Sequence, residues 1–264
     1  MSGFSPERAA AALMGARRVP RLVRRPMGPL PPGARPDTLA EGIAAQVALA
    51  QLSDSAAPAG FKIGATAAQM QVYLGLDGPA AGFMARAGLH ASGSTLSLDG
   101  FFRPGLECEL AVHLQRDIPP GPCTAEAAAE AVDLVMSAIE VVENRYADLQ
   151  AFGTPSLVAD QVFHAAAILG PPVPDWHYLD LAAIRGAISV NGVVRGEGVG
   201  ADLLGHPMQA LAWLAGSAEA AAFGGLRAGQ IVMLGSVCPP IWLDGPVEVE
   251  VGFSPLPSVT LELV

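Results

Sequence analysis

The amino-acid sequence predicts a mixed α/β fold of the α+β type that is rich in β-structure. Residues 187–195 form a strand–turn–strand pattern, in which Asn191 and Gly192 favour a type I′ hairpin turn. Residues 247–251 and 259–263 alternate apolar and polar side chains, as half-buried strands do. Strands and helices do not alternate regularly along the chain, so a doubly wound parallel sheet does not fit the pattern.

The first 60 residues are predicted to be mainly helical. Capping residues and apolar spacing place one helix in residues 1–25 and a second from Thr38 to Leu52, with a proline-rich linker between them. We therefore expect two parts, an N-terminal helical region at 1–60 and a larger domain at 61–264 that carries the chemistry.

Shorter elements are predicted for the larger domain. They are, in chain order, a strand at 61–64, a helix at 66–74, a turn-rich segment at 75–82, strands at 95–98 and 106–114, a helix at 124–135, a strand at 137–142, a helix at 207–214, and a turn and strand at 226–235. The strands at 106–114 and 137–142 carry the acids on which the functional argument depends.

Composition limits the class of protein. With 51% hydrophobic residues and a mean hydropathy of +0.39, the chain of 264 residues can bury a substantial core. No apolar run reaches the ~18 residues that a membrane-spanning helix needs, and a net charge of −10 argues against nucleic acid and anionic membrane as partners. The cysteines Cys108, Cys123 and Cys238 form no CxxC pair, which fits a reducing compartment, and we expect a cytoplasmic protein.

Positive charge is concentrated near the N-terminus. Seven of the fourteen arginines lie in the first 35 residues, where Glu7 is the only acid. Such a composition occurs in mitochondrial transit peptides. However, Pro6 to Arg18 has the spacing of an ordinary amphipathic helix, and we favour that structural interpretation.

The segment from Leu106 to Val112 places two acids on one side of a predicted strand. Side chains alternate between the faces of a strand, so Glu107 and Glu109 point the same way, and Glu140 interrupts a second apolar strand. Carboxylates in apolar surroundings are costly unless a cation offsets their charge, and an all-oxygen set suits Mg²⁺ or Mn²⁺ better than zinc. The alternative, which the spacing alone favours, is the solvated face of an edge strand.

Lys62 is the single lysine among fifteen basic residues. It lies in the apolar segment Phe61 to Gly64, where a surface lysine is not expected. Arginine does not release its proton in a protein, whereas lysine can exchange protons during a reaction. Lys62 is therefore a candidate catalytic residue, with chance under an arginine-biased composition as the alternative.

Other chemical signals are weaker. His113 shares the face of the two acids on its strand, but a lone histidine is more often a hydrogen-bonded structural residue. Arg145 follows the strand at 137–142 and is a candidate to bind a substrate carboxylate, or to pair with Glu143 or Asp148. The sequence contains no Gly-x-Ser-x-Gly, HExxH or phosphate-binding loop.

These residues, in this order, resemble the 2-keto-4-pentenoate hydratase / 4-oxalocrotonate decarboxylase branch of the fumarylacetoacetate hydrolase superfamily. The similarity covers nearly the whole chain. It rests on Ala-Leu-Met-Gly-Ala-Arg-Arg near the N-terminus, Phe61-Lys-Ile-Gly-Ala-Thr66, Pro104-Gly-Leu-Glu-Cys-Glu-Leu110, Ile139-Glu-Val-Val-Glu-Asn-Arg145, Gly205-His-Pro207 and Leu226-Arg-Ala-Gly229.

The resemblance implies a fumarylacetoacetase-like mixed β-roll with flanking helices and a helical N-terminal region, assembled into homo-oligomers. It also implies a Mg²⁺ or Mn²⁺ ion held by Glu107, Glu109 and Glu140, with Lys62 as the active-site lysine.

Two departures from the family pattern concern the substrate side of the site. Ala80 stands where the family often has an aspartate, and Phe163 and His164 replace small residues of a loop that begins at Asp160. The remaining candidate site residues are Asp160 and His164 for catalysis, and Arg145 and Ser236 for substrate binding.

The resulting hypothesis is a metal-dependent hydratase that adds water to a small 2-hydroxy-2,4-dienoate, in the catabolism of aromatic or related compounds. A 4-oxalocrotonate-type decarboxylase and an acylpyruvate C–C hydrolase use the same residues on small 2-oxo or 2-hydroxy acids, so both stay open. A non-catalytic subunit in complex with a pathway enzyme is an alternative of a different class.

Overall fold

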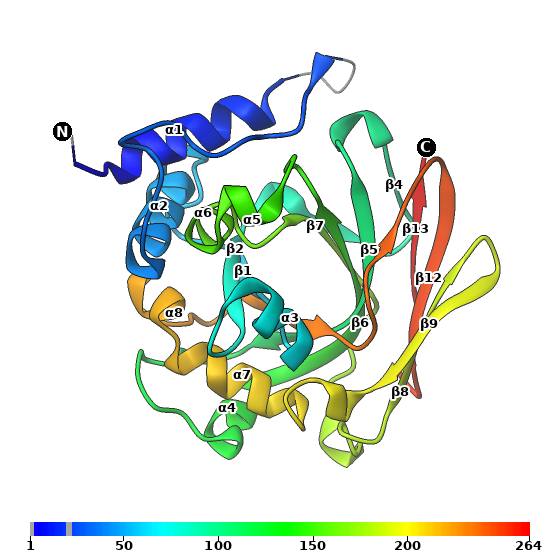
Figure 1. The fold of residues 1–264 in the computed structure, drawn as a ribbon. Coiled ribbons are helices and arrows are strands. Elements are labelled where there is room, and N and C mark those ends of the chain that lie inside the picture. Colours follow the sequence, from blue (N-terminus) through cyan, green and yellow to red (C-terminus); the bar gives the residue numbers. More distant parts are fainter. Residues whose placement is uncertain (1–2, 20–22) are drawn as a thin grey trace.

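Two sheets and a group of helices build the protein, as the computed structural model of residues 3–19 and 23–264 shows. The larger sheet is strongly curved, and most helices gather on one side of it while the smaller sheet lies on the other (Figure 1). The predicted α+β class is therefore confirmed. None of the helices in the described part of the chain has the length and apolar character needed to cross a membrane.

The larger sheet has eight strands. Their order is β2 (Ala80–Met84), β1 (Gly60–Gly64), β10 (Ile231–Ser236), β5 (Pro104–Leu114), β6 (Val132–Glu143), β7 (His164–Leu169) and β3 (Leu89–Ala91), with β11 (Ile241–Trp242) paired to β5. Strands β5 and β6 are long antiparallel neighbours at the centre, whereas β1 and β10 are parallel. Segments from opposite ends of the sequence thus lie side by side.

The smaller sheet has five strands. Their order is β4 (Ser94–Leu96), β13 (Val259–Leu263), β12 (Val247–Ser254), β8 (Arg185–Val190) and β9 (Val193–Val199). The β8–β9 turn places Asn191 and Gly192 at φ values of 51° and 75°, the positive values that a type I′ turn requires. Val249 and Val251 of β12 and Val259 of β13 are buried and the glutamates of both strands are exposed, so the predicted alternation is confirmed.

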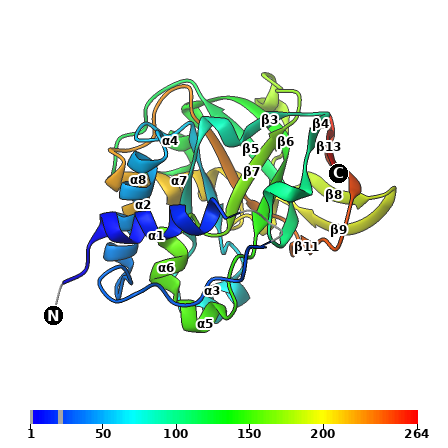
Figure 2. The same cartoon turned by 90° about the horizontal axis from the view of Figure 1, so that it is seen from above.

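Helices cover the other side of the larger sheet (Figure 2). They are α1 (Pro6–Arg17), α2 (Leu39–Leu52), α3 (Ala68–Leu74), α4 (Ala125–Glu130), α5 (Leu149–Phe152), α6 (Thr154–Ala159), α7 (Pro207–Gly216) and α8 (Ala218–Ala222). Ser5 caps α1 by accepting from the Arg8 amide, and Thr38 and Glu41 form a capping box on α2. Helix α2 packs between α1 and α6, and the predicted division at residue 60 stays a prediction.

Three predicted elements were wrong in extent. The first helix ends at Arg17, before Pro20, which cannot follow a helical residue without strain, and part of the predicted range lies outside the described residues. The helix predicted at 124–135 ends at Glu130, because the valine-rich residues after it pair with β5 as a strand. The segment predicted as turn-rich at 75–82 contains the start of β2. This strand forms by pairing with β1, which the turn residues in the local sequence did not reveal.

Candidate metal centre

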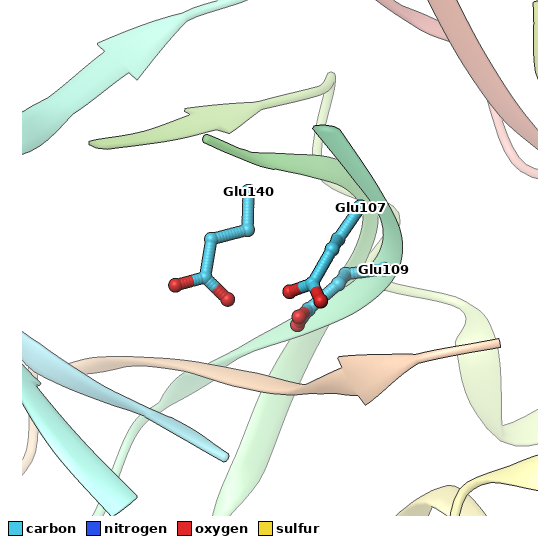
Figure 3. Close-up of side chains that lie close together, drawn as sticks. All are labelled: Glu107, Glu109 and Glu140. Carbon is cyan, nitrogen blue, oxygen red and sulfur yellow. The ribbon is translucent and has the colours of Figure 1, made fainter. Parts of the chain in front are cut away.

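Glu107, Glu109 and Glu140 come together on the two central strands of the larger sheet. Glu107 on β5 stands opposite Glu140 on β6, and Glu109 follows on the same face of β5. One oxygen from each carboxylate lies within 4.8 Å of the others. Figure 3 shows the three side chains converging on the same space from the two strands. The sequence prediction that these acids form one cluster is confirmed, whereas their role as metal ligands stays a prediction.

The cluster contains carboxylate oxygens that the protein leaves without partners. Glu109 and Glu140 are fully buried, and Glu107 is partly exposed to a cavity. Oε2 of Glu109 accepts from the Gly235 amide at 3.0 Å, whereas Oε1 of Glu109 and Oε2 of Glu140 have no hydrogen-bond partner among the described residues. Buried oxygens without donors are costly, and hard divalent cations prefer oxygen ligands. The residues present therefore fit Mg²⁺ or Mn²⁺.

The pKa values of the three carboxyl groups also reflect burial without enough donors or cations nearby. Burial, with a smaller contribution from Glu140, raises the pKa of Glu107 to about 8, and burial raises the pKa of Glu109 well above its usual range. Burial acts on Glu140 too, but Lys62 and His164 outweigh it and lower the pKa of Glu140 to about 2. Burial thus favours the neutral forms of Glu107 and Glu109, while Lys62 and His164 favour the ionised form of Glu140, and a bound divalent cation favours the ionised form of all three.

Lys62 and His164 hold the same oxygen of Glu140. Lys62, on β1, places Nζ 3.4 Å from Oε1 and is 2% exposed. His164, the first residue of β7, places Nδ1 2.8 Å from that oxygen. Because an ionised carboxylate can only accept hydrogen bonds, the imidazole donates to Glu140 through Nδ1, whereas Lys62 forms an ion pair with it. The predicted lysine and histidine are thus both in contact with the carboxylate cluster.

A backbone irregularity in β10 completes the surroundings of Glu109. The register between β10 and β5 shifts between Met233 and Ser236, and Gly235 has a φ of 109°. A Cβ at Gly235 would lie 2.5 Å from the methyl group of Thr66. Only glycine fits this conformation and this space, which lets the Gly235 amide reach the carboxylate.

Asp160 lies outside the carboxylate cluster, in a second buried network. Its Oδ1 accepts from Arg17 at 2.6 Å, and its Oδ2 accepts from Arg145 at 2.9 Å and from the Tyr146 hydroxyl at 2.6 Å. Burial raises the pKa of Asp160, but Arg145 and Arg17 outweigh it and hold the pKa below its usual range. The network ties α1 to the segment before β7. Sequence reasoning missed Arg17 and Tyr146, and the arginine-rich N-terminus was the one available signal.

The two predicted substrate contacts are hydrogen-bonded within the protein. Each nitrogen of the Arg145 guanidinium donates to Asp160, Glu143 or the His164 carbonyl. The Ser236 hydroxyl accepts from the Cys108 amide at 3.2 Å and donates to a backbone carbonyl, but it also lines a cavity. The functional roles of Arg145, Ser236 and Asp160 stay predictions.

His113 does not join the cluster. Its Nδ1 lies 2.6 Å from a carboxylate oxygen of Asp133, and both side chains are partly exposed. The structural interpretation of this histidine is therefore the better one.

A strained segment leads from α6 into β7. Gln161, Val162 and Phe163 have φ values of 61°, 51° and 68°, a left-handed conformation that a β-branched valine rarely adopts and that costs about 1–3 kcal/mol per residue. The Gln161 amide group donates to the Phe83 carbonyl at 2.6 Å, which helps to fix the segment. The conformation places Val162 and Phe163 in a cavity wall, and no glycine marked it in the sequence.

Two cavities meet at Glu107. One has a volume of about 780 Å³ and is lined by Thr66, Ser236 and Cys238 among others. The other has a volume of about 560 Å³ and is also lined by Lys62. Helix α3 contributes side chains to both cavities, and a small molecule in either one can reach the carboxylate cluster.

Comparison with known proteins identifies the class. Residues 66–260 match the family model described as fumarylacetoacetate (FAA) hydrolase C-terminal. The chain therefore belongs to the FAA hydrolase family, as the sequence motifs predicted.

Within that family, the chain is similar to hydratases and to a decarboxylase. It is 33% identical over 183 residues to the 2-hydroxyhexa-2,4-dienoate hydratase of Comamonas testosteroni, with 68% of each chain covered. It is 28% identical over 206 residues to the 4-oxalocrotonate decarboxylase of Pseudomonas putida, covering 78% of this chain and 77% of that one.

A solved structure shares the fold over almost the entire chain. It is the 4-oxalocrotonate decarboxylase from Pseudomonas putida G7, complexed with magnesium and adipate. The TM-score is 0.88 at 23% sequence identity, covering 98% of this chain and 97% of that one. The predicted β-roll with flanking helices is thereby confirmed.

Proposed function

We propose that the protein is a metal-dependent hydratase that adds water to a small 2-hydroxy-2,4-dienoate. The observation that carries this proposal is the cluster of Glu107, Glu109 and Glu140, with two unpartnered buried oxygens, beside the single lysine of the chain. The similarity to a dienoate hydratase supports the reaction, and the magnesium bound by a protein of the same fold supports the cation.

The residues of the site suit this reaction in distinct ways. Bound by the three carboxylates, Mg²⁺ or Mn²⁺ would supply Lewis-acid chemistry to the carboxylate and 2-oxygen of the substrate. Hydration adds the hydroxyl group of water to one carbon of a conjugated double bond and a proton to the other. Lys62 is the cationic group beside the cluster that can hold a developing oxyanion and carry that proton. Phe163 and Val162 offer an apolar wall for the hydrocarbon chain.

Decarboxylation is the second candidate reaction, because a relative at 28% identity is a decarboxylase. It needs the same carboxylates and the same lysine, and so does C–C hydrolysis of an acylpyruvate. A non-catalytic partner subunit is less well supported, since a scaffold gains nothing from three buried carboxylates in one place. We also propose a cytoplasmic homo-oligomer, with association with a pathway enzyme as a further possibility to test by size-exclusion chromatography of the mixed proteins.

The first test is turnover of 2-hydroxypenta-2,4-dienoate, followed by its ultraviolet absorbance with Mg²⁺, with Mn²⁺ and with EDTA. We expect metal-dependent loss of absorbance and a product that has gained water. Glu107→Gln should lower turnover at least 100-fold, whereas Glu197→Gln, an exposed acid on β9, should change it less than 2-fold. Released CO₂ would favour the decarboxylase. Absence of turnover by protein that binds Mn²⁺ would count against the hydratase.

A further inference from the structure

We propose that Arg103 binds the second carboxylate of a dicarboxylic substrate, so that the natural substrate is a small 2-oxo or 2-hydroxy acid with a carboxylate at each end. The inference rests on the proposed function and names its substrate class. Arg103 directly precedes β5, and its side chain lines the same cavity of about 560 Å³ as Lys62 and Glu107. A molecule that fills this cavity therefore meets both the carboxylate cluster and the guanidinium group.

The charges that line this cavity favour an anion at its second end. Among the described residues, Lys62 and Arg103 are its cationic side chains, and Lys62 is already paired with Glu140. Asp148 also lines the cavity, but its Oδ1 accepts from the Gln150 amide at 2.9 Å and caps α5. Arg103 is thus the cation of the cavity with capacity for a further anionic partner.

The guanidinium group of Arg103 is held in place with one nitrogen to spare. Its Nε donates to the Asn144 carbonyl at 2.9 Å, and its Nη2 donates to the Tyr146 carbonyl. The group also lies 5.3 Å from the centre of the Phe102 ring. Nη1 makes no hydrogen bond within the described part of the chain. A preorganised guanidinium binds a carboxylate at a lower entropic cost than a free side chain does.

The wall of this cavity is apolar between the carboxylate cluster at one end and Arg103 at the other. It includes Val142, Leu149, Phe163 and Trp242, together with Met70 from α3. An unsaturated hydrocarbon chain fits such a wall, with one carboxylate at the Glu107 cluster and the other at the arginine. Because Arg103 itself is exposed, water and salt weaken the pair, and we expect a moderate effect on affinity.

The test compares adipate with hexanoate, which has the same number of carbons and one carboxylate fewer. Calorimetry on the Mn²⁺-loaded protein should show adipate binding at least 10-fold more tightly than hexanoate. Arg103→Met should weaken adipate binding about 10- to 50-fold and hexanoate binding less than 2-fold, and Arg103→Lys should restore part of the loss. Arg195→Met, at an exposed position on β9, serves as the matched control and should change neither affinity.

Steady-state kinetics provide the second readout. With a dicarboxylic dienol such as 2-hydroxymuconate, Arg103→Met should raise KM about 10- to 50-fold and leave kcat within about 3-fold. With 2-hydroxypenta-2,4-dienoate, both constants should stay within about 2-fold of wild type. An equal loss for both ligands would show that Arg103 only orders the Asn144–Tyr146 backbone, and would overturn the proposal.

The outcomes separate the substrate class from the reaction. Wild-type protein that binds adipate no better than hexanoate refutes the role of Arg103, even where the monocarboxylic dienoate is hydrated. Conversely, an adipate preference that Arg103→Met abolishes supports the dicarboxylate site even where neither dienoate gains water, and then the proposed hydration fails alone.

Discussion

Replacing His164 should weaken metal binding without removing any of the three carboxylates. His164 donates through Nδ1 to Oε1 of Glu140 at 2.8 Å, and Glu140 is fully buried. A hydrogen bond to a charged group contributes about 1.5–3 kcal/mol. Since each 1.4 kcal/mol is a factor of ten, His164→Ala should weaken Mn²⁺ binding about 10- to 100-fold, as is usual for groups that orient metal ligands.

Two further variants make this prediction specific. The side-chain amide of asparagine can place a donor near the position of Nδ1, so His164→Asn should restore most of the affinity. His113→Ala is the matched control, because that histidine pairs with Asp133 away from the cluster. Free Mn²⁺ is measured by electron paramagnetic resonance during titration, with thermal unfolding as a check on the fold. Wild-type affinity in His164→Ala, or an equal loss in His113→Ala, would refute the reasoning.

Three other outcomes are expected. Asp160→Asn should lower the free energy of unfolding at pH 7 by about 3–5 kcal/mol, because it removes the buried carboxylate that pairs with both Arg17 and Arg145 and leaves Arg145 with Glu143 alone. The folded pKa of Asp160 lies below its unfolded value, so the stability that Asp160 contributes is present at neutral pH and is lost as the pH falls through the folded pKa. Urea unfolding should therefore show a smaller difference in free energy of unfolding between wild type and Asp160→Asn at pH 3 than at pH 7. Glu219→Gln should raise the melting temperature at pH 8 by about a few degrees. Burial raises the pKa of Glu219, so the ionised carboxylate destabilises the fold at that pH, whereas glutamine is neutral and can still accept from the Ala81 amide. That gain should fade at acid pH, where the carboxyl group is neutral in both folded and unfolded chains, and a gain that persists there would contradict the explanation. Lys62→Gln should lower kcat about 10²- to 10⁴-fold in a protein with an unchanged circular dichroism spectrum, and turnover within 2-fold of wild type would exclude proton transfer by this residue.

The acids of the candidate site were predictable because their signal is local. A two-residue spacing puts Glu107 and Glu109 on one face of any strand, although that spacing alone favoured a solvated face over a buried one. The position of Glu140 opposite Glu107 depends on the pairing of β5 with β6, which spacing does not encode, and the family resemblance implied only that the three acids hold one metal ion. Lys62 was detected through composition, since a single lysine in an apolar segment is unusual.

The second network was not predictable from local patterns. Arg17 and Asp160 are separated by 143 positions, and nothing in either neighbourhood specifies the other. The left-handed conformation of Gln161 to Phe163 likewise depends on contacts with distant strands, because these residue types favour other conformations. The same limit explains the missed start of β2 and the overlong helix before β6, where sheet pairing overrides local preference.

The parallel pairing of β1 with β10 has a consequence for synthesis of the protein. Lys62 lies in the first quarter of the sequence, and its strand partner Met233 lies near the end. A nascent chain on the ribosome therefore carries Lys62 and all three acids long before β10 has emerged. Strand β10 lies between β1, which carries the lysine, and β5, which carries two of the acids. Until then β1 and β5 have unpaired edges, and contacts of such long range form slowly. The centre is thus completed only after β10 has been made, and a chain truncated before Ile231 has every acidic residue of the site but lacks the strand that joins β1 to β5.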